Sequence, residues 1–116
     1  MGGPPEMNVA ALQQEVAAFN AQRGWATVHT VESLCVAVSV ESGELLEVTL
    51  WPKDGQVSRA DLLSEMADVG IYLLSLANLL GISLEDAIRA KLEANSGRFP
   101  LVPDARGTLD EQNEPT

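Results

Sequence analysis

The chain has 116 residues, which is room for one domain, because domains run to roughly 100–200 residues. Its 17 acidic and 7 basic residues give a formal net charge of −10. Proteins that bind the backbone of nucleic acids need a basic surface, so this balance argues against nucleic acid as a partner.

No targeting or membrane segment is readable in the chain. Met1–Glu6 lacks the positive segment and the apolar stretch of a signal peptide. The longest apolar run, Val69–Leu80, is too short to cross a bilayer. Cys35 has no second cysteine to pair with and is expected to be a small buried residue. We therefore expect a soluble, cytoplasmic protein without a membrane partner.

The first half of the chain predicts two helices. Apolar residues at helical spacing predict a helix over 8–22, with Asn8 as its N-cap. The valines of 31–50 alternate and could form a strand, but this segment between Thr30 and Trp51-Pro52 is too long for one, so we predict a helix. A glycine inside a helix costs about 1 kcal/mol relative to alanine, so we expect a close helix contact at Gly43.

Two further helices and a tail complete the predicted domain. Residues 53–57 form a turn, and Ser58 with Asp61 opens a helix that runs to Leu80. Ser83 with Asp86 opens a fourth helix, which Gly97 is expected to end near Asn95. We expect a domain over 8–100, disorder over 1–7, and an acidic, proline-containing arm or disordered tail over 101–116.

Four helices with short connections predict an all-α protein. The helices over 31–50 and 58–80 are apolar on more than one face, so a narrow monomer core cannot bury them. A second copy of the chain is the direct way to cover the surplus. We therefore predict a four-helix bundle assembled by oligomerisation.

Two pairs of carboxylates stand inside the apolar stretches of these helices. Glu41 and Glu44 form one pair, and Glu65 and Asp68 form the other; a spacing of three places each pair on one helix face. Antiparallel packing of the two helices would bring all four together. Such a cluster repels itself unless cations neutralise it, and Mg²⁺, or alternatively Mn²⁺, is the hard cation that prefers oxygen ligands.

Two other interpretations of the carboxylates are open. Acidic pairs on amphipathic helices are usually solvated surface, although two pairs with apolar neighbours favour a metal site. A di-iron bundle requires Glu-x-x-His pairs, whereas the only histidine, His29, lies in a connector. The di-iron alternative is therefore disfavoured.

The ordered set of motifs resembles a known family. Glu41-x-x-Glu44 followed by Glu65-x-x-Asp68 resembles the E-x-x-E…E-x-x-D signature of the MazG-like, all-α nucleoside triphosphate pyrophosphohydrolases. The resemblance covers about Leu12 to Pro100 and is nearest to the short, single-domain branch that includes the dCTP pyrophosphatases. The further motifs that carry it are Arg23-Gly24-Trp25, His29-Thr30-x-x-Ser33-Leu34, Leu45-Leu46-Glu47, Asp68-Val69-x-Ile71-Tyr72 and Lys91-x-x-x-Asn95-x-x-Arg98.

This resemblance implies an activity and roles for named residues. Family members cleave a nucleoside triphosphate to the monophosphate and pyrophosphate. The resemblance implies a house-cleaning enzyme that removes deoxynucleoside triphosphates, either dCTP-like or modified ones. The magnesium ligands would be Glu41, Glu44, Glu65 and Asp68. The catalytic residues would be Glu41 and Glu44, and Glu41 would also orient or deprotonate the attacking water. Family members are dimers or tetramers, so we expect a homotetramer built as a dimer of dimers, with a dimer as the alternative.

Residues outside the carboxylates have two interpretations each. The stripe formed by Lys91, Asn95 and Arg98 would suit phosphate oxygens or is an exposed basic face. Tyr72 reaches a phosphate or packs in the core. Trp25 and Trp51 either stack on the base or pack in the protein. His29 either binds the base or sugar or is an ordinary loop residue. Glu47 is either a further metal ligand or a surface residue.

A competing hypothesis keeps the fold without the chemistry. A non-catalytic helical oligomer could act as a regulatory or nucleotide-sensing partner. Binding of a nucleotide with Mg²⁺ and turnover that depends on the carboxylates distinguish the enzyme from this alternative.

Overall fold

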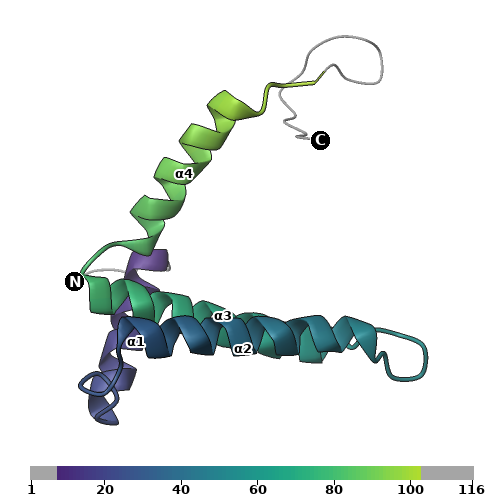
Figure 1. Cartoon of the computed structure of the whole chain (residues 1–116), viewed down its shortest axis with the longest axis horizontal. Helices are drawn as coiled ribbons and strands as arrows, with labels where there is room; N and C mark the ends of the chain where they lie inside the picture. Colours follow the sequence, from purple (N-terminus) through teal and green to yellow (C-terminus); the bar gives the residue numbers. More distant parts are fainter. Residues whose placement is uncertain (1–7, 103–116) are drawn as a thin grey trace, which may run out of the picture. The chain divides into compact units, whose positions relative to one another are not determined.

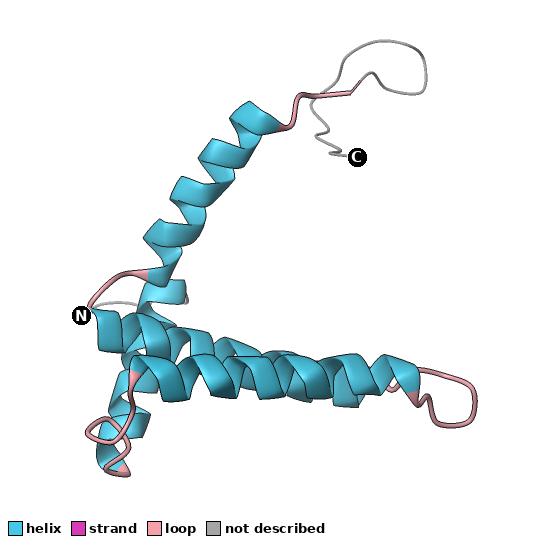
Figure 2. Cartoon of the chain, viewed as in Figure 1, coloured by secondary structure: helices cyan, strands magenta, loops and turns pink. Residues whose placement is uncertain are grey.

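The computed structural model describes residues 8–102 and consists of helices joined by loops (Figures 1 and 2). The helices are α1 (Val9–Gln22), α2 (Val31–Leu50), α3 (Arg59–Leu80) and α4 (Leu84–Arg98). Within this described part, the only strand-like pairing is an isolated bridge between Lys53 and Gln56. The all-α prediction is therefore confirmed. The expectations for 1–7 and for 103–116 lie outside the described residues.

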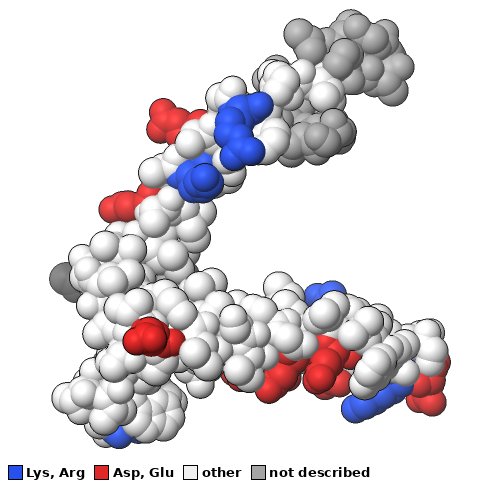
Figure 3. Space-filling model, viewed as in Figure 1, with Lys and Arg blue, Asp and Glu red and all other residues white. Residues whose placement is uncertain are grey.

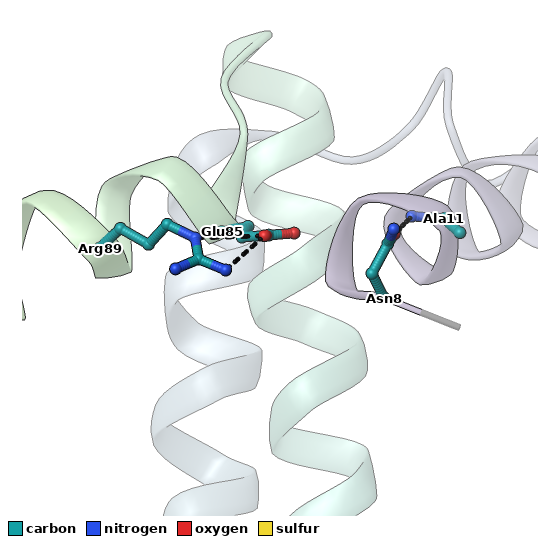
Figure 4. Close-up of polar contacts among 4 residues, drawn as sticks. All are labelled: Asn8, Ala11, Glu85 and Arg89. Carbon is teal, nitrogen blue, oxygen red and sulfur yellow. Dashed lines mark hydrogen bonds and ion pairs between the residues drawn. The ribbon is translucent and has the colours of Figure 1, made fainter. Parts of the chain in front are cut away.

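Each of the first three helices begins at a polar side chain that caps it. Asn8 accepts a hydrogen bond from the backbone N–H of Ala11 at 2.8 Å (Figure 4). Thr30 and Ser33 cap α2 reciprocally, and Ser58 accepts from the N–H of Asp61 at 3.1 Å. These side chains satisfy amide donors that have no partner within the helix, so the predicted starts are confirmed.

A tight turn connects α2 to α3. Asp54 and Gly55 both have positive φ, 52° and 74°, and the backbone N–H of Gln56 donates to the carbonyl of Lys53 at 2.9 Å. Positive φ at two central residues is the geometry of a turn that reverses the chain sharply. As a result α2 and α3 run antiparallel and lie side by side along their length (Figure 1).

α1 packs against the C-terminal half of α3. The amide of Gln13 donates to Asn78 Oδ1 at 3.1 Å and to the carbonyl of Ile82 at 2.8 Å, and it accepts from the N–H of Leu84 at 3.1 Å. Leu34 of α2 is the most deeply buried large side chain, with 1% of its surface exposed. The small core thus lies where α1 and the start of α2 each pack on the C-terminal half of α3.

Two expectations for α2 are wrong. Cys35 is exposed, because its neighbour Leu34 occupies the inward face and one helical residue rotates the next side chain by about 100°. A Cβ on Gly43 would meet no heavy atom of the described chain within 4 Å, so the expected close contact is absent here.

The chain divides into two compact units, the first ending at Leu84 and the second beginning at Glu85. The second unit contains nearly all of α4, where Arg89 donates to Glu85 at 3.1 Å (Figure 4). α4 continues through Gly97 to Arg98, so the expected stop near Asn95 is wrong. Pro100 disfavours helical geometry at Phe99, which explains why the helix ends there and not at the glycine.

Much of the apolar surface of the first three helices stays exposed in the single chain. Among the apolar residues of α1, only Val16 is buried. α3 is long and apolar enough to cross a membrane by length and composition, with a mean hydropathy of 1.3, a test that core helices of soluble proteins also pass. Here this helix pairs with α2 and carries the acidic residues Glu65 and Asp68.

Candidate metal and nucleotide site

The paired helices bring the predicted carboxylates together. One oxygen each of Glu41 and Glu44 on α2 and of Glu65 on α3 lie within 4.8 Å of one another. On the face drawn in Figure 3, acidic side chains gather along one edge of the α2–α3 pair. We call Glu41, Glu44, Glu65 and the neighbouring Asp68 the acidic cluster.

Crowding changes the acidity of two members of the acidic cluster. Burial is the largest cause of the raised pKa of the Glu41 carboxyl, followed by the negative charges of Glu44, Asp68 and Glu65. Burial also raises the pKa of the Glu65 carboxyl, again with neighbouring negative charges. The charged cluster is therefore unfavourable without a positive partner.

Asp68 belongs to the cluster through Glu41. Asp68 raises the pKa of Glu41 by its negative charge and as a hydrogen-bond acceptor for the protonated Glu41 carboxyl. Glu44, on the opposite helix, raises the pKa of Glu65 in the same two ways. Carboxyl pairs that share a proton are typical of acidic sites in the absence of a cation.

One oxygen of the acidic cluster is buried without a hydrogen-bond partner. This atom is Glu65 Oε1, the only buried side-chain oxygen or nitrogen in the described part of the chain that lacks a partner. A buried carboxylate oxygen without a donor is costly, because its interaction with water is lost and not replaced. A hard divalent cation bound by these oxygens would supply the missing partner, so the residues present fit Mg²⁺ or Mn²⁺.

A cavity of about 460 Å³ adjoins the acidic cluster and shares Asp68 with it. Its volume lies in the range of about 300–1,000 Å³ typical of small-molecule sites. The residues that line it come from α1 and the following connector (Phe19, Asn20, Trp25, Val28 and His29) and from α3 (Asp68, Ile71, Tyr72 and Ser75).

The connector 23–30 holds the aromatic side of the cavity in place. Trp25 donates its backbone N–H to the carbonyl of Asn20 at 2.9 Å, and His29 donates to the carbonyl of Trp25 at 3.1 Å. The Trp25 ring meets the Phe19 ring edge to face, with centroids 5.8 Å apart. The guanidinium of Arg23 lies over the Phe19 ring at 3.5 Å. These contacts orient flat apolar surfaces next to the acidic cluster.

The other predicted site residues fall into three places. Trp25, His29 and Tyr72 line the cavity together. Trp51 is 70% exposed at the C-cap of α2 and does not line the cavity, and Glu47 is exposed on α2. The proposed phosphate-binding stripe, Lys91, Asn95 and Arg98, lies on α4 in the second unit, where Arg98 stacks on Phe99 at 4.8 Å.

Sequence analysis missed five residues of the cavity: Phe19, Asn20, Val28, Ile71 and Ser75. The apolar ones resemble ordinary core residues. A signal existed for Asn20 and Ser75, since each is a polar residue within an otherwise apolar helical stripe. A buried polar side chain in such a stripe must find a partner and often marks a site.

Comparison with known proteins identifies the family. The MazG-like family model matches residues 36–106, more than half of the chain. Human dCTP pyrophosphatase 1 is 34% identical over 104 residues, covering 83% of this chain and 61% of the human protein. The bovine dCTP pyrophosphatase 1 is 33% identical over 93 residues, covering 73% and 55% of the respective chains. The chain thus spans about three fifths of the length of these curated relatives.

Solved structures share the fold. A pyrophosphatase from Archaeoglobus fulgidus matches with a TM-score of 0.71 and 29% identity, over 86% of this chain and 99% of that one. The iMazG protein from Vibrio DAT 722 matches with a TM-score of 0.57 and 25% identity, over 80% and 98%. With the helices, the acidic cluster and these matches in agreement, the chain belongs to the MazG-like family.

Proposed function

We propose that this protein is a magnesium-dependent nucleoside triphosphate pyrophosphohydrolase, which cleaves a deoxynucleoside triphosphate to the monophosphate and pyrophosphate. The observation that carries the proposal is the shared position of Asp68, which belongs both to the acidic cluster and to the cavity of about 460 Å³. A nucleotide has the same two parts, a charged triphosphate and a flat base. The dCTP pyrophosphatase and pyrophosphatase names of the matched proteins support this assignment.

The two parts of the site would bind the two ends of the substrate. Glu41, Glu44, Glu65 and Asp68 would hold the cations that accompany the triphosphate. The base would enter the cavity between the aromatic residues Trp25 and Tyr72. Stacking on aromatic faces favours a base over a small anion and excludes water from its surface.

The chemistry asked of the side chains is limited. Bound Mg²⁺ would neutralise the triphosphate and lower the pKa of a water molecule. Glu41 has a raised pKa and is half-buried beside Asp68, so its carboxylate is suited to orient the attacking water and accept its proton. The oxygen of that water forms the new P–O bond, the bond between the α and β phosphates breaks, and pyrophosphate leaves.

The remaining assignments extend the proposal beyond the first unit. Lys91, Asn95 and Arg98 share one stripe of α4 at positions i, i+4 and i+7 and would bind phosphate oxygens. Trp51 would serve as a second stacking surface.

We also propose that the chain self-associates, as a dimer of dimers. Large apolar side chains remain exposed on both helices that carry the acidic cluster, including Leu46 on α2 and Met66 on α3 at 57% and 55%. Burying such surface is worth about 25 cal/mol per Å². A second copy presents the matching surface by symmetry.

A substrate panel tests the reaction. Deoxy- and ribonucleoside triphosphates are incubated with Mg²⁺, and pyrophosphate and orthophosphate are measured separately. We expect pyrophosphate as the first product, with loss of turnover on chelation by EDTA. Orthophosphate as the primary product would assign cleavage to a different bond.

Two substitutions test the site with a matched control. Glu44→Ala and Asp68→Ala should each reduce pyrophosphate release by at least about 100-fold, because each removes a ligand of the cations that stabilise the transition state. Glu32→Ala, an exposed glutamate in the first turn of α2, should keep wild-type activity. Retained turnover in both cluster variants would refute the assigned ligands.

Ligand binding separates the enzyme from a non-catalytic oligomer. A non-hydrolysable deoxynucleotide with Mg²⁺ at a hundred times its dissociation constant should stabilise the fold by about 2.7 kcal/mol. The non-catalytic oligomer predicts no thermal shift with this ligand.

A further inference from the structure

Asn20 of α1 and Ser75 of α3 form a buried polar pair that lines the cavity. Their exposed fractions are 6% and 4%, and the Asn20 amide nitrogen donates to the Ser75 hydroxyl at 2.9 Å. The Ser75 hydroxyl in turn donates to the carbonyl of Ile71, one turn earlier on α3, at 2.8 Å. The proposed chemistry does not use either residue.

This chain of hydrogen bonds fixes the orientation of the Asn20 amide. A serine hydroxyl has one proton, and here the proton goes to the Ile71 carbonyl. Toward Asn20 the hydroxyl can therefore only accept, so the NH₂ end of the amide must face it. The carbonyl end, Oδ1, is directed away from Ser75.

Oδ1 of Asn20 is an unpaired hydrogen-bond acceptor. None of the described residues donates a hydrogen bond to this atom, although Asn20 is 94% buried by its exposed fraction of 6%. Asn20 and His29 also border a second cavity of about 210 Å³, so both residues line two cavities. Glu65 Oε1 is the one fully buried side-chain atom without a partner among the described residues, so Oδ1 keeps access to solvent through the cavity that Asn20 lines, and a ligand in that cavity can donate to it.

We propose that Asn20 is a specificity-determining residue, whose Oδ1 accepts a hydrogen bond from an exocyclic amino group of the bound nucleobase, and that Ser75 is the positioning residue that holds Oδ1 toward the base. This inference rests on the proposed function, since it needs a base in the cavity. An oxo group at the same position of the base would put two acceptor oxygens face to face. The site therefore favours amino-bearing bases over their oxo counterparts.

Pairs of substrates that differ at one exocyclic position test this proposal. The pairs are dCTP against dUTP and dATP against dITP, an amino base against an oxo base in each, so the test does not depend on ring size. The comparison uses whichever of the two pairs the wild-type enzyme cleaves faster. Within that pair, kcat/KM for the amino base should exceed kcat/KM for the oxo base by at least about tenfold, because the oxo base leaves Asn20 Oδ1 without a hydrogen-bond donor.

Two variants distinguish recognition from packing. Asn20→Ala removes the acceptor and should bring the amino-to-oxo ratio close to one. Ser75→Ala leaves the asparagine in place but releases its amide to turn, so the ratio should fall while the better substrate is still cleaved. Gln13→Ala is the matched control, because Gln13 is a buried amide on the same helix that does not line the cavity; it should lower stability and leave the ratio unchanged.

The outcomes separate this inference from the function on which it rests. If the wild-type protein releases pyrophosphate from no nucleotide, the proposed function fails and this inference fails with it. If it releases pyrophosphate without preferring the amino base, or if the ratio persists in Asn20→Ala and Ser75→Ala, the function stands and the role of Asn20 is overturned. Should Asn20→Ala not fold, the ratios of the wild type and of Ser75→Ala decide.

Discussion

At the scale of single residues, the acidic cluster links protonation to stability. The pKa of Glu65 is raised above its usual value of 4.5, mainly by burial, so the folded protein binds this proton more tightly than the unfolded chain does. The stabilisation is complete below the unfolded pKa and is lost as the pH rises through the raised folded pKa. Glu41 behaves in the same way.

We therefore predict a pH-dependent loss of stability that one substitution reduces. In EDTA, the free energy of unfolding of the wild type should fall between pH 4.5 and neutral pH more steeply than that of Glu65→Gln. Urea denaturation at a series of pH values measures both slopes. Glu32→Gln is the control and should keep the wild-type slope, and added Mg²⁺ should restore stability at neutral pH. Equal slopes for the wild type and Glu65→Gln would contradict this account.

Residue types and spacing predicted the acidic cluster but not the cavity. The i, i+3 spacing places both carboxylates of a pair on one helix face whatever the neighbouring residues are. The proximity of Glu41, Glu44 and Glu65 could therefore be predicted from the sequence. Asn20 and Ser75 are 55 residues apart, and their contact depends on the rotation of α1 against α3. No local pattern in the sequence encodes that rotation.

At the scale of helices, local chemistry predicted the boundaries well. Asn8, Thr30 and Ser58 cap their helices as expected, because capping depends only on the neighbouring amides. The error at the end of α4 has the opposite origin: a glycine is tolerated inside a helix, and Gly97 lacks the positive φ that ends α3 at Gly81.

The interior glycine of α2 supports a stability prediction. A Cβ at Gly43 would meet no heavy atom within 4 Å, so Gly43→Ala should stabilise the chain by about 1 kcal/mol through helix propensity alone. Thermal or urea denaturation measures the change. Gly81→Ala is the contrasting variant, because Gly81 has a φ of 69° and alanine there should destabilise. A lower stability of Gly43→Ala would mean that another subunit packs closely against this position.

At the scale of the whole molecule, the exposed apolar surface leads to a prediction about assembly. Sedimentation should find the wild type as a tetramer or dimer, and Leu46→Glu should shift it toward the monomer, because a charge is costly in a buried interface. Gln14→Glu adds the same charge at an exposed position of α1 and should leave the assembly unchanged. A wild type that sediments only as a monomer would contradict the proposal.

The dual membership of Asp68 has a consequence for dissecting the enzyme. Whatever occupies the cavity and whatever neutralises the cluster would both touch this one carboxylate, so their affinities should be thermodynamically linked, each altering the other by the same factor. A substitution at Asp68 would then weaken both the binding of a ligand in the cavity and the binding of a cation by the acidic cluster. Glu44 lies in the cluster but outside the cavity lining, and it is the position at which cation binding can be altered separately.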